Sequence, residues 1–377
     1  MTIMDRYILR QFIQVYAICF CSLTGLYVVI DAFGNLDEFL AYAEEHGNLL
    51  GVMAEYYAYR SIGFFDRTAA ILTLISAMFT VTWLERHNEL TALLAAGVRT
   101  VRVIKPVIVA AVVISVVAAA GREWLIPNIR HQLSRKAQDL SAGAAGDLQP
   151  RYDHETDVRI DGEAAFAEAR RIHHPKFLLP EPLQQYGRQL EAEDAIYQPP
   201  QNNRPGGYRL TGVTLPKGLA ERPSLSLGDR PVIITPRDAM WLAADECFVA
   251  SNVSFDQLAD SSAWRQYAST AQLIAGLRNA SLDYGADVRV AVHARVVQPL
   301  LDVTLLFLGL PLVLARGDRN VFVATGLCLA VVTAFLLVGI GCQMLGSSYM
   351  LSPSLAVWLP LMIWVPAAVV ISQPLRD

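Results

Sequence analysis

Long stretches without a charged residue alternate with polar segments along this chain and predict membrane-spanning helices. An apolar helix needs about 20 residues to cross a bilayer. The stretch at 296–315 contains one acid, Asp302, and the others contain no Asp, Glu, Lys or Arg. The stretches cover residues 11–30, 68–84, 106–121, 296–315 and 320–375.

The last stretch, residues 320–375, is far too long for one span. Residues 346–349 (GSSY) and the dipeptide Ser352-Pro353 divide it in two, so the pattern predicts six transmembrane helices in all. The second and third stretches are short, and we expect their helices to continue past Arg67 and Arg122 into the membrane interface.

The polar middle of the chain, from residue 123 to about residue 290, is large enough to form a domain. Residues 123–140 are typical of a helical stalk. Short apolar or alternating runs follow, separated by Pro and Gly, and 201–207 (QNNRPGG) resembles a loop tip. The runs predicted as strands are 157–160, 208–215, 231–236 and 247–255.

Among the short loops between the predicted spans, Lys and Arg concentrate on one side of the membrane. The loops at 32–51 and 344–354 contain neither residue. Cytoplasmic loops carry the excess of positive charge, so both termini are predicted to be cytoplasmic and residues 123–290 extracytoplasmic. The charges that set this orientation are Arg6, Arg10, Arg86, Arg99, Arg102, Lys105, Arg316, Arg319 and Arg376.

The predicted fold class is an α-helical membrane protein with six transmembrane helices and an extracytoplasmic all-β, jellyroll-like domain between helices 3 and 4. Residues 1–122 would hold the first three spans, with a short cytoplasmic helix at 85–97. Residues 123–290 would form the β domain with its stalk, and residues 291–377 the last three spans.

Composition supports a membrane protein and excludes several function classes. Hydrophobic residues make up 53% of the chain and charged residues 18%, below the quarter or so usual in soluble proteins. The net charge of −4 provides no basic field for nucleic acid. Of the five cysteines only Cys247 lies in the polar middle, so no disulfide framework is implied.

No motif for catalysis, metal binding or nucleotide binding is present. The chain lacks G-x-x-x-x-G-K-[ST], so it does not bind ATP through a P-loop of its own. His154, His173 and His174 do not have zinc-site spacing, and there is no H-E-x-x-H. We therefore expect neither an enzyme nor a cofactor or metal site, and the energy for transport would come from a partner or an ion gradient.

The segment 85–97 has the pattern of a capped amphipathic helix. Asn88 is placed to cap it, Glu89 lies in the first turn, where the helix dipole favours an anion, and Gly97 is a natural stop. One face of the helix would be apolar, because residues at helical spacing bring together Leu90, Leu93, Leu94, Gly97 and Val98.

Two interpretations of this helix remain open. It could be an interfacial connector that only reverses the chain. The small residues Ala92, Ala95 and Ala96 would let another surface approach closely, however, and a connector has little need of such a helix. We favour a docking helix for a partner.

Four arginines flank the extracytoplasmic ends of spans and form a candidate headgroup site: Arg60, Arg67, Arg122 and Arg295. Guanidinium groups pair well with the phosphates of a glycolipid. The alternative is ordinary snorkelling to phospholipid, or pairing with the neighbouring acids Asp66 and Glu123.

Asp302 is an acid inside the fourth span. An intramembrane carboxylate can relay protons. Carriers of that kind usually show paired repeats around broken helices, which this chain lacks, so hydrogen bonding between helices is the favoured role.

Five segments carry a resemblance to known proteins. In chain order they are DRYILRQF, ELTALLAAGVRTVRVIKP (residues 89–106), EWLIPNIRHQ, VHARVVQPLLDVTLLFLGLPLVL and LSPSLAVWLP. Together they resemble the lipopolysaccharide-transport permeases of the LptF/LptG (YjgP/YjgQ) family, and residues 89–106 are similar to the family signature between spans 2 and 3. Two departures are FFDRTAA, where the family often has a Pro-rich start to span 2, and Asp31 and Asn35, where a lysine is expected.

The resemblance implies a permease subunit of an ATP-binding-cassette exporter in the inner membrane, paired with a second LptF/LptG-type permease. A cytoplasmic, LptB-like ATPase dimer would bind Glu89, with Arg86, Leu93 and Gly97 completing the coupling site. Lipopolysaccharide or a related glycolipid would pass through the β domain to an LptC/LptA-like periplasmic bridge.

Two alternatives of other classes remain. A membrane-anchored sensor or assembly factor that binds an extracytoplasmic ligand would also have six spans and an outer domain, but it would not need a capped cytoplasmic helix. A proton-coupled carrier would depend on Asp302.

Overall fold

The computed structural model describes most of the chain, in two compact units. The helical unit contains Met1–Leu36, Leu50–Leu133 and Gly285–Asp377, and the β unit contains Asp37–Leu49 and Ser134–Tyr284. Arg316, Arg319, Arg376, two residues of the predicted loop tip and most of the end of the predicted stalk lie outside the described residues. Those described are 2–135, 137, 145–146, 148, 150–166, 169–201, 204–228, 230–259, 261–314 and 321–372.

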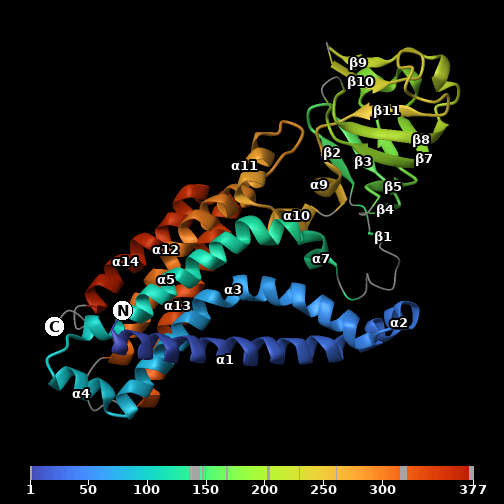
Figure 1. The fold of residues 1–377 in the computed structure, drawn as a ribbon. Helices are drawn as coiled ribbons and strands as arrows, with labels where there is room; N and C mark the ends of the chain where they lie inside the picture. Colours follow the sequence, from blue (N-terminus) through green and yellow to red (C-terminus); the bar gives the residue numbers. More distant parts are fainter. Residues whose placement is uncertain are drawn as a thin grey trace. The chain divides into compact units, whose positions relative to one another are not determined.

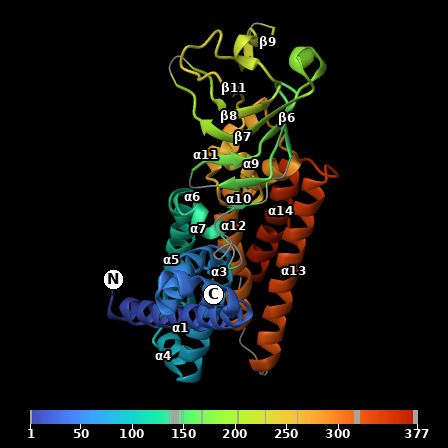
Figure 2. The same cartoon turned by 90° about the vertical axis from the view of Figure 1, so that its right-hand side faces the viewer.

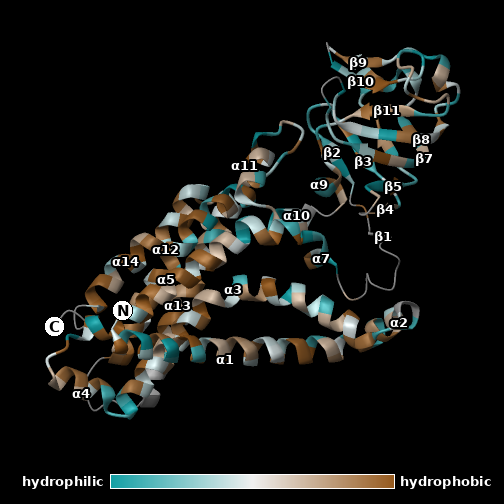
Figure 3. Ribbon diagram, in the orientation of Figure 1, coloured by the Kyte–Doolittle hydropathy of each residue, from teal (hydrophilic) through white to brown (hydrophobic). Residues whose placement is uncertain are grey.

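Among the described residues, six helices are long and apolar enough to cross a membrane, which confirms the predicted six spans (Figures 1 and 3). The helical unit consists of α1 (Ile3–Gly34), α3 (Leu49–Arg86), α4 (Glu89–Ala95), α5 (Thr100–Ala120), the π-helical turn η1 (Gly121–Leu125), α6 (Ile126–Asn128), α7 (Arg130–Ser134), α12 (Ala286–Leu314), α13 (Val321–Ser347) and α14 (Pro353–Ile371). Helix α2 (Leu36–His46) connects α1 to α3 in sequence.

The predicted break in the last apolar stretch is confirmed. Helix α13 ends at Ser347, and Tyr349 follows with a φ of 58°, in the left-handed region that a helix cannot continue through. Helix α14 begins at Pro353, where the missing N–H would have had no partner in any case.

The π-helical turn η1 was not predicted. It replaces the last α-helical turn before Pro127. Proline cannot donate a hydrogen bond to the carbonyl of Glu123, four residues earlier, and its ring collides with that carbonyl in an α-helix. A wider π turn accommodates this, and it changes the direction in which Arg122 and Glu123 project.

Helices α12, α13 and α14 pack side by side (Figure 2). Gly346 of α13 is buried at this contact. A Cβ atom on Gly346 would lie 2.5 Å from Ala356 Cβ in α14 and 3.0 Å from Val290 Cγ2 in α12. Close helix approach through a small residue is the usual way in which helices associate in membranes.

Helix α1 contributes little to the core of the helical unit. Only Asp5, Ile8 and Phe12 are buried, and all three lie in its first third. Ile8 and Phe12 pack into the apolar cluster shared by α3, α5, α12, α13 and α14. Farther along α1, large apolar side chains such as Leu26 and Ile30 are exposed.

The β unit is built around one antiparallel sheet of eleven described strands. Strand β7 pairs with β8 along one edge, and its other edge divides between β5 and β6, which lead to two separate branches. The strands are β1 (Ala145–Gly146), β2 (Arg151–Asp153), β3 (Val158–Asp161), β4 (Ala164–Phe166), β5 (Arg171–His173), β6 (Lys176–Leu178), β7 (Gln189–Gln198), β8 (Gly207–Leu215), β9 (Leu225–Leu227), β10 (Arg230–Ile234) and β11 (Cys247–Ala250).

The short turns η2 (Glu181–Tyr186) and η3 (Leu219–Glu221) and the helices α9 (Phe255–Ala259), α10 (Ser261–Tyr267) and α11 (Thr270–Arg278) complete the described elements. An antiparallel β domain inserted between the third and fourth spans is confirmed.

Strands β3, β8 and β10 match predicted runs, but the run at 247–255 was predicted too long. Strand β11 ends at Ala250, and α9 begins at Phe255. The backbone N–H of Ser254 donates to Gln257 Oε1, which provides a side-chain cap at the start of this helix. Apolar alternation alone does not reveal that cap.

A bidentate pair ties β8 to the segment before β11. Arg209 donates from Nε (3.0 Å) and from one terminal nitrogen (2.6 Å) to Glu246 Oε2, and Oε1 accepts from the same terminal nitrogen at 2.8 Å. Burial raises the pKa of Glu246. The hydrogen bond from the Ala243 N–H, together with the hydrogen bonds and charge of Arg209, lowers it by more, so the pKa lies below its usual 4.5.

Glu246→Gln is expected to lower the stability of the β unit at pH 7 by about 1–3 kcal/mol, because a buried charged hydrogen-bond acceptor is lost. A depressed pKa means that the stabilisation is complete above the unfolded-state pKa and is lost as pH falls through the folded-state pKa. The wild type should therefore lose protection in β8 and β11 between about pH 5 and pH 3, as measured by hydrogen exchange.

In Glu246→Gln, the hydrogen-exchange protection of β8 and β11 should depend less on pH across this interval. Glu221→Gln, at an exposed carboxylate, is the control and should behave as the wild type does. If protection in Glu246→Gln falls equally steeply as the pH is lowered, groups other than Glu246 determine the pH dependence.

Candidate functional site

Helix α4 is short but has a well-defined end. The Val98 N–H donates to the Leu93 carbonyl, and the Gly97 N–H to the Leu94 carbonyl, each at 3.0 Å. Gly97 has a φ of +81°, which a residue with a side chain rarely adopts. This is the Schellman arrangement, so Gly97 stops α4 as the sequence predicted.

The start of α4 differs in detail from the prediction. Asn88 occupies the N-cap position, but it has a left-handed conformation with a φ of 56°, and its side chain makes no capping hydrogen bond. A normal N-cap has extended backbone, which would bring its side chain near the first free N–H groups. Asn88 instead allows a sharp turn out of α3.

The predicted apolar face of α4 packs on the helical unit. Leu90 is buried in the main apolar cluster, and Leu93, Leu94 and Val98 pack against it. The other face is open, since Thr91, Ala92, Ala95 and Ala96 are all exposed. The structure therefore separates a face that anchors α4 from a smooth face of small residues.

The predicted coupling residues occupy different parts of this helix. Arg86 is exposed at the end of α3, Leu93 is half-buried on the anchoring face, and Gly97 forms the stop. Glu89 is half-buried, and its Oε1 accepts a hydrogen bond of 3.1 Å from the hydroxyl of Tyr7 in α1. No sequence pattern reveals this contact, because 82 residues separate the two side chains.

The four predicted headgroup arginines do not form one ring. Arg122, in the π turn, pairs with Asp66 of α3. Its Nε donates to Oδ1 at 3.0 Å, and a terminal nitrogen lies 2.9 Å from the same oxygen. Arg295 of α12 lies within electrostatic range of Glu123, Arg122 and Asp66. Two cations and two acids therefore gather between α3, η1 and α12.

Arg60 and Arg67 lie elsewhere on α3. Arg60 donates to the hydroxyl of Tyr56 at 2.9 Å and lies over its ring. The adjacent Tyr57 donates to Asp31 of α1 at 2.9 Å. Arg67 is exposed. Pairing of an arginine with Asp66, the alternative that the sequence left open, occurs at Arg122.

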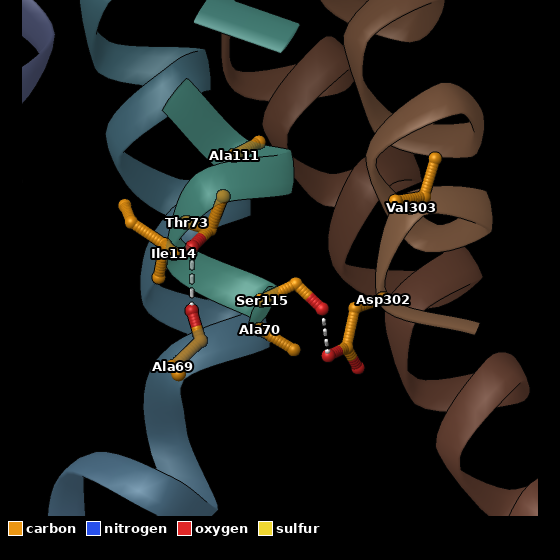
Figure 4. Close-up of a pocket in the computed structure, with 8 residues that line it drawn as sticks. All are labelled: Ala69, Ala70, Thr73, Ala111, Ile114, Ser115, Asp302 and Val303. Atoms are coloured by element: carbon orange, nitrogen blue, oxygen red, sulfur yellow. Dashed lines mark hydrogen bonds between the residues drawn. The ribbon is translucent and has the colours of Figure 1, made fainter. Parts of the chain in front are cut away.

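Asp302 makes a hydrogen bond between helices, the role that the sequence favoured, and a second one within its own helix. Its Oδ2 accepts from Ser115 of α5 at 3.0 Å, and its Oδ1 accepts from Gln298, one turn earlier in α12, at 2.8 Å. Figure 4 shows Asp302 and Ser115 beside a small pocket that both residues line. The other lining residues are Ala69, Ala70, Thr73, Ala111, Ile114 and Val303.

Within the described residues, no group of three or more His, Cys, Asp or Glu side chains could hold a metal ion. The histidines singled out from the sequence lie in the β unit. His173 Nδ1 lies 3.0 Å from Asp194 Oδ1, and the rings of His173 and His174 are 4.1 Å apart.

Comparison with known proteins identifies the chain by family. No curated protein matches it. The family model described as "Lipopolysaccharide export system permease LptF/LptG" matches residues 6–152 and 229–373, which include all six spans, α4 and the start and end of the β unit. The match covers most of the chain, and the protein belongs to the lipopolysaccharide export system permease LptF/LptG family.

Proposed function

We propose that this permease is one of two membrane subunits of an ATP-driven exporter, and that its α4 helix is the docking site for a separate ATPase dimer. The lipid would be lipopolysaccharide or a related glycolipid taken from the inner membrane. The β unit would receive it and pass it to a periplasmic bridge protein. The second permease would be an LptF/LptG relative or another copy of this chain.

The observation that carries the docking proposal is the division of α4 into two faces. Leu90 anchors one face in the apolar cluster, while Ala92, Ala95 and Ala96 leave the other smooth and exposed. A partner surface can approach such a face closely. Glu89, at the edge of the exposed face, would pair with a cationic side chain of the ATPase.

The orientation is also part of the proposal. Arg86, Arg99 and Lys105 are exposed around α4, at the end of the helical unit that contains the N-terminus. Positive charge concentrates on the cytoplasmic side of membrane proteins. We therefore place α4 and both termini in the cytoplasm and the β unit in the periplasm.

For the lipid headgroup, we propose contacts by Arg60, Arg67, Arg122 and Arg295, with unequal roles. Arg122 and Arg295 lie among Asp66 and Glu123, so a phosphate there would have to compete with carboxylates. The exposed Arg67 is better placed for a first contact.

Glu89→Ala tests the docking proposal. Wild-type and variant permease would be purified from detergent-solubilised membranes, and ATPase activity would be measured in the eluate. We expect an ATPase to co-purify with the wild type and its recovery to fall about tenfold or more in the variant, because one partner of a desolvated charge pair is removed.

Glu44→Ala, at an exposed acid of α2, is the matched control and should leave recovery unchanged. A stable wild-type protein that recovers no ATPase would contradict the exporter proposal. It would favour a membrane-anchored sensor or assembly factor instead.

A further inference from the structure

The beginning of α1 is joined by two polar contacts to the segment that contains α4. The Tyr7 hydroxyl donates to Glu89 Oε1 at 3.1 Å, at the first residue of α4. Asp5 Oδ2 lies 3.2 Å from a terminal nitrogen of Arg102, in the first turn of α5. The same Asp5 oxygen accepts from the Thr2 N–H and so caps α1. One turn of α1 therefore contacts the chain both at the start of α4 and shortly after its end.

From this geometry we infer that Tyr7 is a positioning residue for the ATPase contact. Its hydroxyl holds the Glu89 carboxylate in place, and Glu89 then bridges the cationic group of the ATPase to the first transmembrane helix. The inference rests on the docking of an ATPase at α4, and it adds the residue through which that docking reaches α1.

The hydrogen-bonding capacity of the carboxylate permits such a bridge. A carboxylate has two oxygens and about four acceptor positions, and Tyr7 occupies one position on Oε1. The remaining positions can accept a guanidinium or ammonium group without displacing the tyrosine. A side chain that is already held in place loses less conformational freedom on binding, which favours association.

The surroundings of Tyr7 also fit a recognition surface. The Tyr7 side chain is 43% exposed, and Trp83, at the end of α3, is 46% exposed. The Trp83 ring lies 4.3 Å from that of His87, whose Nδ1 is 2.9 Å from the Trp83 carbonyl oxygen. Exposed aromatic side chains therefore lie at the start of α1 and at the end of α3, the helix that leads into α4, and a partner on α4 would find them accessible.

Helix α1 can transmit a displacement because it is continuous and lightly held. Its 32 residues extend over about 48 Å without a break. Beyond Phe12, Tyr16 packs against the main apolar cluster, and farther along α1 the contacts with α3 follow: Tyr27 stacks on Phe64 at 5.4 Å, and Asp31 accepts from Tyr57. A pull on Tyr7 would therefore reach the far end of α1, where these contacts lie.

A double-mutant cycle between Tyr7→Phe and Glu89→Ala tests the inference. The permease would be placed in nanodiscs, and its affinity for the ATPase that co-purifies with the wild type would be measured. Tyr7→Phe is expected to weaken binding by about three- to tenfold, the effect of losing a hydrogen bond to a charged group. In the Glu89→Ala background it should have no further effect, because the carboxylate it positions is gone.

Tyr349→Phe, in the turn between α13 and α14, is the control and should leave affinity unchanged. The thermal unfolding midpoint of Tyr7→Phe should match that of the wild type, since the ring is kept. Equal weakening by Tyr7→Phe with and without Glu89 would show a general structural role and overturn the inference.

The two proposals fail in different ways. If Glu89→Ala weakens binding but Tyr7→Phe does not, only the positioning role of Tyr7 is overturned. If Glu89→Ala leaves ATPase affinity unchanged, docking through Glu89 is wrong, and the role of Tyr7 is overturned with it.

Discussion

Arg122→Ala is expected to destabilise the helical unit by about 3 kcal/mol, because it leaves Asp66 charged and without this cation in a poorly hydrated place. The side chains of Arg122 and Asp66 are only 24% and 16% exposed, and both oxygens of Asp66 lie within 3.1 Å of Arg122 Nε. The measurement is the midpoint of thermal unfolding in nanodiscs, followed by tryptophan fluorescence.

The double variant Asp66→Ala/Arg122→Ala should be more stable than Arg122→Ala alone, because no charge is then left uncompensated. Arg289→Ala, at an exposed arginine of α12, is the control and should shift the midpoint little. If Arg122→Ala unfolds as the control does, the Asp66–Arg122 pair contributes nothing measurable and Arg122 is available for lipid phosphates.

Gly346→Ala is expected to destabilise the contact between α12, α13 and α14 by about 1–3 kcal/mol, the usual effect of overpacking a core. The new methyl group would lie 2.5 Å from Ala356 Cβ. That atom cannot rotate away, because Cβ is fixed by the backbone, so α13 and α14 must move apart. The thermal unfolding midpoint in nanodiscs would show the loss.

Gly341→Ala provides a matched control in the same helix, because nothing lies within 4 Å of a Cβ built there. This change should be neutral or slightly stabilising, since alanine is the better helix former. Ala356→Gly in the Gly346→Ala background should restore much of the lost stability. Equal effects of Gly346→Ala and Gly341→Ala would contradict the close packing at Gly346.

The helical part of the fold could be predicted well because a membrane imposes a simple rule. A span must bury a long apolar segment and satisfy its own backbone, so charge-free runs reveal helices directly. The interruption before Pro353 was evident because the last charge-free run is too long for one span. The apolar face of α4 was predicted from its spacing, and the structure places Leu90 in the core.

What the sequence did not reveal depends on tertiary geometry. No sequence pattern indicates that Tyr7 would contact Glu89, or that Asp31 would contact Tyr57. The four headgroup arginines were grouped by their common depth in the membrane, but depth says nothing about position around the bundle. The structure separates Arg122, which faces Asp66, from Arg60, which contacts Tyr56.

The limited burial of α1 has a consequence for the life of the protein in the cell. A helix that buries only Asp5, Ile8 and Phe12 against its own chain gains little stability there and depends on neighbouring molecules for the rest. Copies made in excess over the proposed partner subunits would expose this helix to membrane proteases. We therefore expect matched synthesis of the subunits, with surplus copies removed by degradation.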